Sequence, residues 1–163
     1  MVIKKEVLDK TCLFCTSFFY IKEVFILEDI NKYVGIPHYF NQDSFDGCDC
    51  IGLCRLFYKE HGWKQDFKDG KPITKDWQKT DGAIRLFRYF KQNFKETKNL
   101  NELSFGDIVL FDVAGDYHFG IYLEYGKVLG MEVPVRYGKS ISTVYHKKLW
   151  INGFVSGFKR KND

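Results

Sequence analysis

The hydrophobic pattern of this chain changes period once, and that change limits the folds open to it. Up to residue 96, apolar residues recur at helical spacing in two segments, 50–61 and 82–96. After residue 106, the apolar runs are short, rich in β-branched and aromatic residues, and separated by turn residues. These runs predict strands at 107–113, 118–125, 127–135, 140–146 and 151–159. Helices followed by strands predict an α+β domain with an antiparallel sheet of about five strands.

The length and composition predict a single globular domain. The chain has 163 residues, of which 45% are hydrophobic and 18% aromatic, enough to bury a substantial core. We expect residues 31–163 to form this domain. Residues 1–30 are expected to be an N-terminal extension that packs on it as strand or helix, with an apolar run at Val24-Phe25-Ile26-Leu27.

The first helical segment begins with a cysteine. Asp49 precedes the segment and is expected to cap it, and Gly62 is expected to end it. One side is apolar or small and the other is polar: the first carries Cys50, Leu53, Cys54 and Phe57, and the second carries Arg55, Lys59, Glu60 and His61. Cys50 therefore lies in the first turn of an amphipathic helix.

A thiol in a first helical turn is a candidate nucleophile. The unpaired backbone N–H groups of that turn and the positive end of the helix dipole favour a thiolate. We therefore expect Cys50 to titrate below the usual cysteine pKa of about 8.5. The same N–H groups can donate hydrogen bonds to an oxyanion that forms during attack.

A histidine on a strand supplies a candidate base. His118 begins the predicted strand 118–125, and strand alternation places it on one face with Gly120. The opposite face, with Phe119 and Ile121, is the expected core face. We expect Gly120 to leave open space beside the imidazole of His118.

Four short motifs carry a family resemblance. They are Gly35-Ile36-Pro37-His38-Tyr39, Asp49-Cys50-Ile51-Gly52-Leu53, Gly106-Asp107 followed by an apolar strand, and His118-Phe119-Gly120-Ile121-Tyr122. In order and spacing, from about Tyr33 to Val133, the chain resembles the NlpC family of papain-like cysteine peptidases. Its closing stretch, Leu149 to Arg160, is similar to the end of the branch of that family found in bacteriophage tails.

The resemblance implies a papain-like fold and a cysteine-histidine mechanism. Cys50 would be the nucleophile and His118 the general base. It further implies that the protein cleaves amide bonds in peptidoglycan stem peptides without a cofactor or a metal. The expected partners are other phage tail proteins. The family's tyrosine after Gly-x-Pro lines the substrate or oxyanion site. Here His38 and Tyr39 both stand near that position, and we favour Tyr39, with Asp49 as a second lining residue.

The third catalytic position departs from the family pattern. The family places a polar residue twelve positions after the base, where it orients the imidazole, and this chain has Gly130 there. We expect Glu132 to substitute if the hairpin loop is Tyr125-Gly126-Lys127, because Gly130 and Glu132 then share a face with His118. A two-residue loop would turn both away. The other interpretation of Glu132 is an ordinary solvated carboxylate.

Two other function classes stay open. One is a structural tail protein that keeps the peptidase fold without hydrolysis, and Gly130 supports it. The other is a metal or iron-sulfur module, whose ligands would come from the five cysteines although their spacing is imperfect: Cys12, Cys15, Cys48, Cys50 and Cys54.

Charge, cysteine content and hydropathy limit the compartment and the binding partners expected for this chain. Five cysteines without regular spacing favour synthesis in a reducing cytoplasm, before assembly into a virion tail if the resemblance holds. The 25 basic residues are interspersed with 21 acidic ones, so nucleic-acid binding is not predicted. No apolar run is long enough for a membrane-spanning helix, and no secretory signal is expected at the N-terminus.

Overall fold

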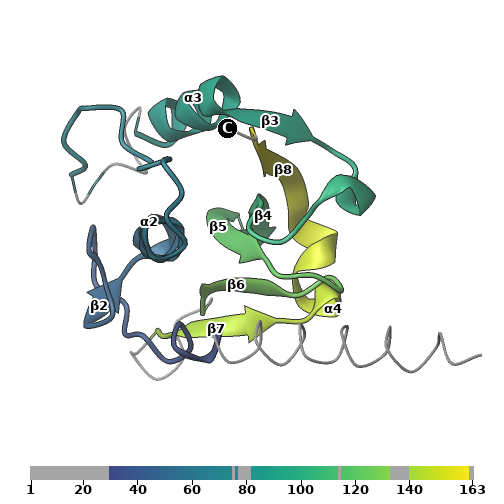
Figure 1. Cartoon of the computed structure of the whole chain (residues 1–163), viewed down its shortest axis with the longest axis horizontal. Helices are drawn as coiled ribbons and strands as arrows, with labels where there is room; N and C mark the ends of the chain where they lie inside the picture. Colours follow the sequence, from purple (N-terminus) through teal and green to yellow (C-terminus); the bar gives the residue numbers. More distant parts are fainter. Residues whose placement is uncertain (1–29, 75, 77–81, 114, 133–139, 162–163) are drawn as a thin grey trace, which may run out of the picture. The chain divides into compact units, whose positions relative to one another are not determined.

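The structure is a computed structural model that describes residues 30–74, 76, 82–113, 115–132 and 140–161. The chain divides into two units, Met1–Lys32 and Tyr33–Asp163, and the second contains every helix and strand labelled in Figure 1. The predicted packing of the extension, residues 1–30, falls outside the described residues except at its last position.

The second unit contains both helices and strands. Its α-helices are α2 (Cys50–Glu60), α3 (Gly82–Asn93) and α4 (Lys147–Trp150). Its strands are β1 (Asp43–Ser44), β2 (Gly47–Cys48), β3 (Phe94–Thr97), β4 (Ile108–Val113), β5 (Asp116–Tyr122), β6 (Val128–Met131), β7 (Ser142–Tyr145) and β8 (Phe154–Arg160). Among the described helices, none is both long and apolar enough to span a membrane.

Six strands form one antiparallel sheet in the order β3-β8-β4-β5-β6-β7. The α+β architecture predicted from the sequence is confirmed, with six strands in this sheet rather than five. The additional strand is β3, because the predicted helix 82–96 ends at Asn93 and Phe94–Thr97 pairs with β8. A separate two-stranded sheet, β1 and β2, directly precedes α2.

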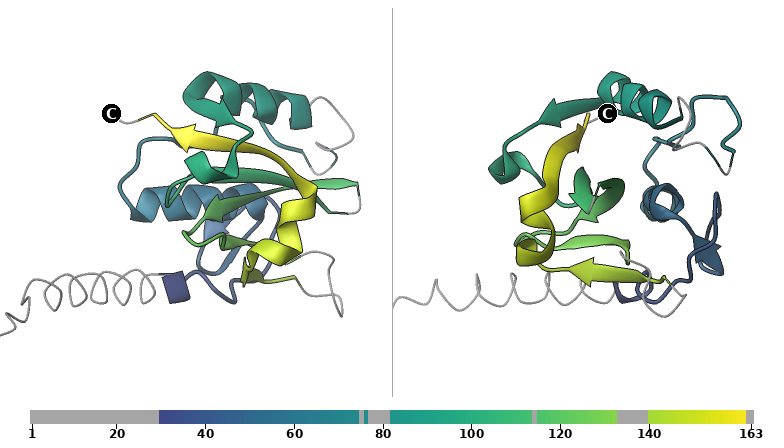
Figure 2. Two further views of the ribbon diagram at one scale, coloured as in Figure 1. Left: turned by 90° about the vertical axis from the view of Figure 1, so that its right-hand side faces the viewer. Right: turned by 180° about the vertical axis from the view of Figure 1, so that it is seen from behind.

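Both faces of the large sheet are covered. Helix α2 lies on one side of the strands and α4 on the other, and the reverse view in Figure 2 agrees with Figure 1. Phe90 of α3 stacks on Phe119 of β5, with ring centroids 4.7 Å apart. On the opposite face, Trp150 of α4 belongs to a buried cluster with Val109 and Phe111 of β4. The predicted core face is confirmed, since Phe119 and Ile121 are buried, but the opposite face, which carries His118, is covered by α4 rather than exposed.

Helix α2 is more deeply buried than its pattern predicts. All residues from Ile51 to Tyr58 are buried, because α2 contacts β5 and β6 as well as β1 and β2. Arg55, which the pattern places on a polar face, is only 7% exposed, and its Nη1 donates to Asn41 Oδ1 at 3.4 Å. The helix ends at Glu60 with His61 as its C-cap, and the predicted stop, Gly62, follows directly with a φ of 68°, in the left-handed region that glycine adopts easily.

Candidate active site

The N-terminus of α2 is held by the carboxylate of Asp49. Its Oδ1 accepts a hydrogen bond from the Gly52 N–H at 2.7 Å, and its Oδ2 accepts one from the Asn41 N–H at 2.6 Å. The predicted helix cap is thereby confirmed. The same carboxylate also ties the preceding loop to the helix, so Cys50 starts from a fixed backbone position.

Gly52 is required by the close approach of that loop. A Cβ at Gly52 would lie 1.7 Å from the carbonyl oxygen of Gln42, which is a backbone atom and cannot rotate away. The glycine of the Asp-Cys-x-Gly motif therefore allows the loop to pack directly against the first turn of α2.

Cys50 is half-buried as a residue, and the pKa of its thiol is raised to about 12. Removal of the thiolate from water is the largest cause, and the negative charge of Asp49 adds to it. Backbone N–H groups of Phe119, Ile51 and Cys50 lower the pKa but do not outweigh burial. The expected depression of the Cys50 pKa was wrong in its net direction, because the neighbouring sheet desolvates the sulfur more than the helix stabilises its charge.

The pairing of β5 with β6 stops short of the strand ends. Its last pair is Gly120↔Gly130. The Leu123 N–H donates to the Lys127 carbonyl at 2.9 Å, so alternate residues of β5, including Phe119, direct their N–H groups toward β6. Phe119 lies just beyond the last pair, where the two strands separate.

The sulfur of Cys50 lies at this separation. It accepts a hydrogen bond from the Phe119 N–H, while the Met131 carbonyl, which would continue the ladder, accepts one from the Tyr145 hydroxyl at 2.7 Å. Phe119 directly follows His118. The structure therefore brings Cys50 of α2 to the part of β5 that carries the predicted base.

His118 is half-buried and lies opposite Phe111 of β4, with ring centroids 6.0 Å apart. The expected open space beside the imidazole is absent at Gly120. A Cβ there would meet Val128 Cγ1 at 2.5 Å and Phe111 Cε1 at 3.4 Å. Gly120 thus allows two side chains to pack across the strand, on the same face as His118.

The hairpin between β5 and β6 confirms the predicted face of Gly130. The register pairs Gly120 with Gly130, and a three-residue loop, 124–126, connects the strands one position earlier than predicted. Tyr125 and Gly126 have φ values of 53° and 73°, as the two central residues of a type I′ turn require. The shift preserves strand alternation, so Gly130 faces the same way as His118.

Glu132, the predicted substitute for Gly130, follows the end of β6 and is half-buried. Its N–H donates to the Ile141 carbonyl at 2.7 Å, and its carbonyl accepts from Ser140 Oγ at 2.8 Å. These bonds fix its backbone beside the segment that leads into β7. Register alone would place Glu132 across from His118, but the β5–β6 pairing ends two residues earlier.

Tyr39, the predicted lining residue, is 53% exposed. Its N–H donates to the Cys48 carbonyl at 3.1 Å, and its ring covers Gly47, where a Cβ would lie 2.0 Å from Tyr39 Cδ2. The competing His38 is also exposed, and its N–H donates to the Ser140 carbonyl at 2.8 Å. Both residues are therefore held beside the segment that leads into Cys50.

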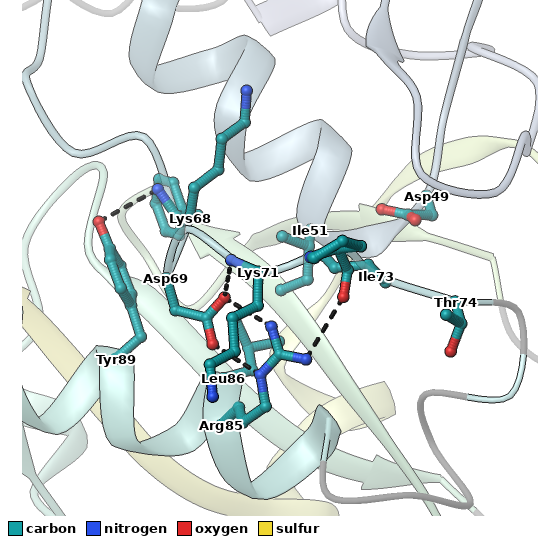
Figure 3. Close-up of a pocket in the computed structure, with 12 residues that line it drawn as sticks. Asp49, Ile51, Lys68, Asp69, Lys71, Ile73, Thr74, Arg85, Leu86 and Tyr89 are labelled. Carbon is teal, nitrogen blue, oxygen red and sulfur yellow. Dashed lines mark hydrogen bonds and ion pairs between the residues drawn. The ribbon is translucent and has the colours of Figure 1, made fainter.

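A small pocket of about 60 Å³ lies at the start of α2, and Cys50 itself is not among its lining residues (Figure 3). Its lining includes Asp49 and Ile51, the two neighbours of Cys50, together with residues of the α2–α3 loop and of α3. In this arrangement Asp49 caps the helix and lines the pocket. The pocket is too small for a whole peptide but has room for one short side chain or a carboxyl group.

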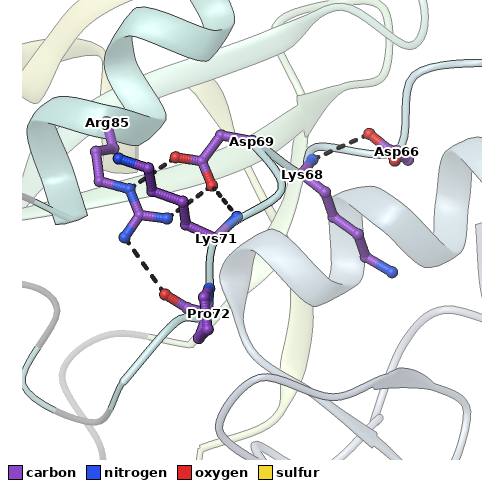
Figure 4. Close-up of polar contacts among 6 residues, drawn as sticks. All are labelled: Asp66, Lys68, Asp69, Lys71, Pro72 and Arg85. Carbon is purple, nitrogen blue, oxygen red and sulfur yellow. Dashed lines mark hydrogen bonds and ion pairs between the residues drawn. The ribbon is translucent and has the colours of Figure 1, made fainter.

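An ion pair holds the far wall of this pocket (Figure 4). Arg85 of α3 contacts both oxygens of Asp69, Nε to Oδ2 and Nη2 to Oδ1, each at 2.7 Å. The pairing lowers the pKa of the Asp69 carboxyl to about 2. Arg85 Nη1 also donates to the Pro72 carbonyl at 3.3 Å, so α3 holds the loop in place. No sequence motif marked this pair, because its members lie 16 residues apart across a loop.

The remaining described cysteines are buried free thiols. They are Cys48 and Cys54, and burial raises the pKa of each. Cys48 Sγ contacts Met131 Sδ at 3.7 Å, as a core residue does. Within the described residues, no group of three or more histidine, cysteine or acidic side chains is arranged to hold a metal ion. Cys12 and Cys15 lie outside those residues.

Comparisons with known proteins identify the family and the fold to which this site belongs. Residues 35–156 match the model of the NlpC/P60 family. Among solved structures, the chain is similar to the NlpC/p60 domain of the peptidoglycan hydrolase SagA, with a TM-score of 0.50 and 18% identity over 82% of this chain and 95% of that one. At that identity the likeness concerns the fold. No curated protein matches the chain. The predicted papain-like fold is confirmed, and the chain belongs to the NlpC/P60 family.

Proposed function

We propose that this protein is a cysteine endopeptidase that hydrolyses amide bonds in peptidoglycan stem peptides. The observation that carries the proposal is the hydrogen bond from the Phe119 N–H to the Cys50 sulfur. The thiol at the start of the helix thus contacts the residue that directly follows His118, which supports a Cys50–His118 pair in a chain of the NlpC/P60 family. The solved relative SagA, a peptidoglycan hydrolase, supports the same substrate class.

The proposed chemistry begins from a neutral thiol. Because the pKa of Cys50 is raised to about 12, the sulfur keeps its proton at neutral pH until a base removes it. His118 takes that proton as sulfur attacks the amide carbonyl, and a C–S bond forms. His118 then gives the proton to the leaving amine as the C–N bond breaks. Water, activated by His118, hydrolyses the thioester and restores the thiol.

Backbone N–H groups are the proposed oxyanion donors. The N–H groups of Cys50 and Ile51 point toward the sulfur, whereas that of Gly52 is taken by Asp49. Two donors at the start of α2 therefore face the place where a carbonyl oxygen becomes negative during attack. Tyr39, exposed beside Cys48, is the proposed lining side chain from the preceding segment.

The charge near the pocket suits an acidic peptide. Lys68 and Lys71 are exposed residues of the pocket lining, while the Asp69 carboxylate is neutralised by Arg85. With the Asp49 carboxylate included, the lining keeps a net positive charge. Stem peptides of peptidoglycan carry free carboxylates, which such a positive rim attracts. The floor, which includes Ile51 and Leu86, suits the short aliphatic parts of the same peptide.

The proposed setting is a phage tail, to which the protein comes after synthesis in the host cytoplasm. The similarity of Leu149 to Arg160 to the end of tail-associated family members supports this setting. In the fold, much of that stretch forms β8, between β3 and β4. Mass spectrometry of purified tail particles tests it, and absence of the protein from such particles would refute it.

The activity is tested by incubating purified peptidoglycan with the protein and following new amino termini. We expect release by the parent protein, and a loss of about 10³-fold or more in Cys50→Ala and His118→Ala. His146→Ala is the matched control, because His146 is an exposed histidine before α4 whose side chain makes no cap hydrogen bond. No release by the parent would refute the hydrolase and favour the structural tail protein, which the glycine at position 130 supports.

A further inference from the structure

Two paired glycines, Gly120 of β5 and Gly130 of β6, leave a bare strip of backbone beside His118. Side chains from other strands cover the strip. Phe111 of β4 lies over Gly120, and Tyr145 of β7 lies over Gly130, with its Cε2 at 3.5 Å from where a Cβ would be. The tyrosine ring therefore fills the space that a side chain at position 130 would occupy.

Tyr145 lies on the same face as His118. Tyr145 pairs with Val128, Gly130 pairs with Gly120, and strand alternation carries this face along β5 to His118. One ring links the two residues: the Phe111 centroid is 6.0 Å from that of His118 and 6.1 Å from that of Tyr145. The tyrosine and the histidine thus belong to one aromatic cluster.

The Tyr145 hydroxyl lies where β5 and β6 separate. It donates to the Met131 carbonyl at 2.7 Å, and Met131 is the β6 residue that faces the Phe119 N–H across the separation. That N–H is the group bonded to the sulfur of Cys50. The hydroxyl has given its one proton to Met131, so its oxygen can only accept further hydrogen bonds.

We propose that Tyr145 is the positioning residue of His118, with its hydroxyl oxygen accepting the imidazole N–H that does not face Cys50. The proposal rests on the proposed function and replaces Glu132 as the substitute for a side chain at Gly130. The hydroxyl reaches the site from β7, and its proton is committed to Met131, so it acts as an acceptor with a fixed direction. A neutral acceptor orients the ring but stabilises an imidazolium less than a carboxylate does.

The test compares three variants that each change one polar group. Tyr145→Phe keeps the ring over Gly130 and removes the hydroxyl. Thr143→Val is the matched control, because Thr143 pairs directly with Gly130 and presents another hydroxyl to the same face. Glu132→Gln tests the carboxylate. Thermal unfolding of each variant establishes that it folds.

Two readouts need no substrate. One is an NMR titration of the His118 ring, and the other is the rate of iodoacetamide alkylation at Cys50 against pH, followed on the Cys50 peptide by mass spectrometry. Tyr145→Phe is expected to lower the His118 pKa measurably, because it removes an acceptor that favours the charged ring. It should also slow alkylation near neutral pH several-fold, while Thr143→Val changes neither.

Steady-state kinetics then test whether Tyr145→Phe affects the chemical step rather than substrate binding. With peptidoglycan as substrate, Tyr145→Phe should lower kcat about 10-fold to 100-fold with KM unchanged, as loss of an orienting partner does. Unchanged titration and alkylation in Tyr145→Phe, or the same changes in Glu132→Gln instead, would overturn the proposal. If those two readouts respond but the parent releases no peptide, the proposed function fails while the positioning of His118 by Tyr145 stands.

Discussion

Gly52 and Gly130 both lie in the site, yet the space around them differs. A Cβ at Gly52 would lie 1.7 Å from the carbonyl oxygen of Gln42, whereas at Gly130 the nearest atom, on the Tyr145 ring, is 3.5 Å away. The first glycine is required by neighbouring backbone. The second has room for a methyl group and allows a side chain from another strand to lie over it. The glycine beside the nucleophile is thus explained by backbone packing within one local segment. The glycine beside the base instead leaves room for the side chain of Tyr145 from another strand.

The largest effect that tests this contrast is expected from Gly52→Ala. The new methyl group cannot avoid the Gln42 carbonyl, so the loop or the helix must shift, at a cost of about 3 kcal/mol or more in the free energy of unfolding. Gly130→Ala, the matched substitution, should change that free energy by at most about 1 kcal/mol, since its Cβ makes ordinary contacts and alanine suits a strand better than glycine. Urea unfolding measures both. Equal effects would remove the distinction between the two glycines.

A second substitution tests whether Tyr145 occupies the place of a third catalytic side chain. Gly130→His introduces a larger side chain where the Tyr145 ring lies, and we expect a cost of about 2 kcal/mol from overpacking. In a Tyr145→Ala background the same histidine should cost much less, because the space is open. A double-mutant cycle on urea unfolding measures the coupling. Additive effects would show that the two positions do not compete for one space.

Local rules were sufficient to predict the nucleophile side of the site. The Asp49 cap, the helix start at Cys50 and the stop at Gly62 each depend on a few adjacent residues, and each is confirmed. On the base side, strand alternation predicted the face of Gly130 even though the loop was one position off, because any three-residue loop keeps the same parity.

The features that the sequence did not predict depend on contacts between distant segments. Tyr145 reaches Gly130 only through the pairing of β6 with β7, and no spacing in the sequence encodes that approach. The raised pKa of Cys50 was missed for the same reason. Helix position alone predicts a lowered value, while the desolvation that dominates comes from the packing of α2 on the sheet.

The raised pKa of Cys50 predicts an alkaline loss of stability. The thiol has a pKa of about 12 in the folded protein and about 9.0 when exposed, so above pH 9 the unfolded chain loses this proton while the folded protein keeps it. The contribution is fully present below about pH 9 and is lost as the pH rises toward 12. Between pH 8.5 and 10, the parent should lose about 1 kcal/mol more unfolding free energy than Cys50→Ala. Equal losses would show that desolvation of this thiol is weaker than its burial implies.

The smallest effect on stability is expected from Asp49→Asn, and it separates the two roles of Asp49. Asparagine caps helices about as well as aspartate, so the free energy of unfolding should change by about 0.5 kcal/mol or less. The negative charge that raises the pKa of Cys50 is removed, so alkylation of Cys50 near pH 8 should be several-fold faster than in the parent.

Asp49→Ala provides the contrast, because it removes the charge and also leaves the N–H groups of Gly52 and Asn41 without their acceptor. It should cost about 1–2 kcal/mol in unfolding free energy. If Asp49→Asn leaves the alkylation rate unchanged, the charge of Asp49 does not reach the sulfur. The reactivity of Cys50 would then be governed wholly from the sheet side, by the Phe119 N–H and His118, and the start of α2 would supply position alone.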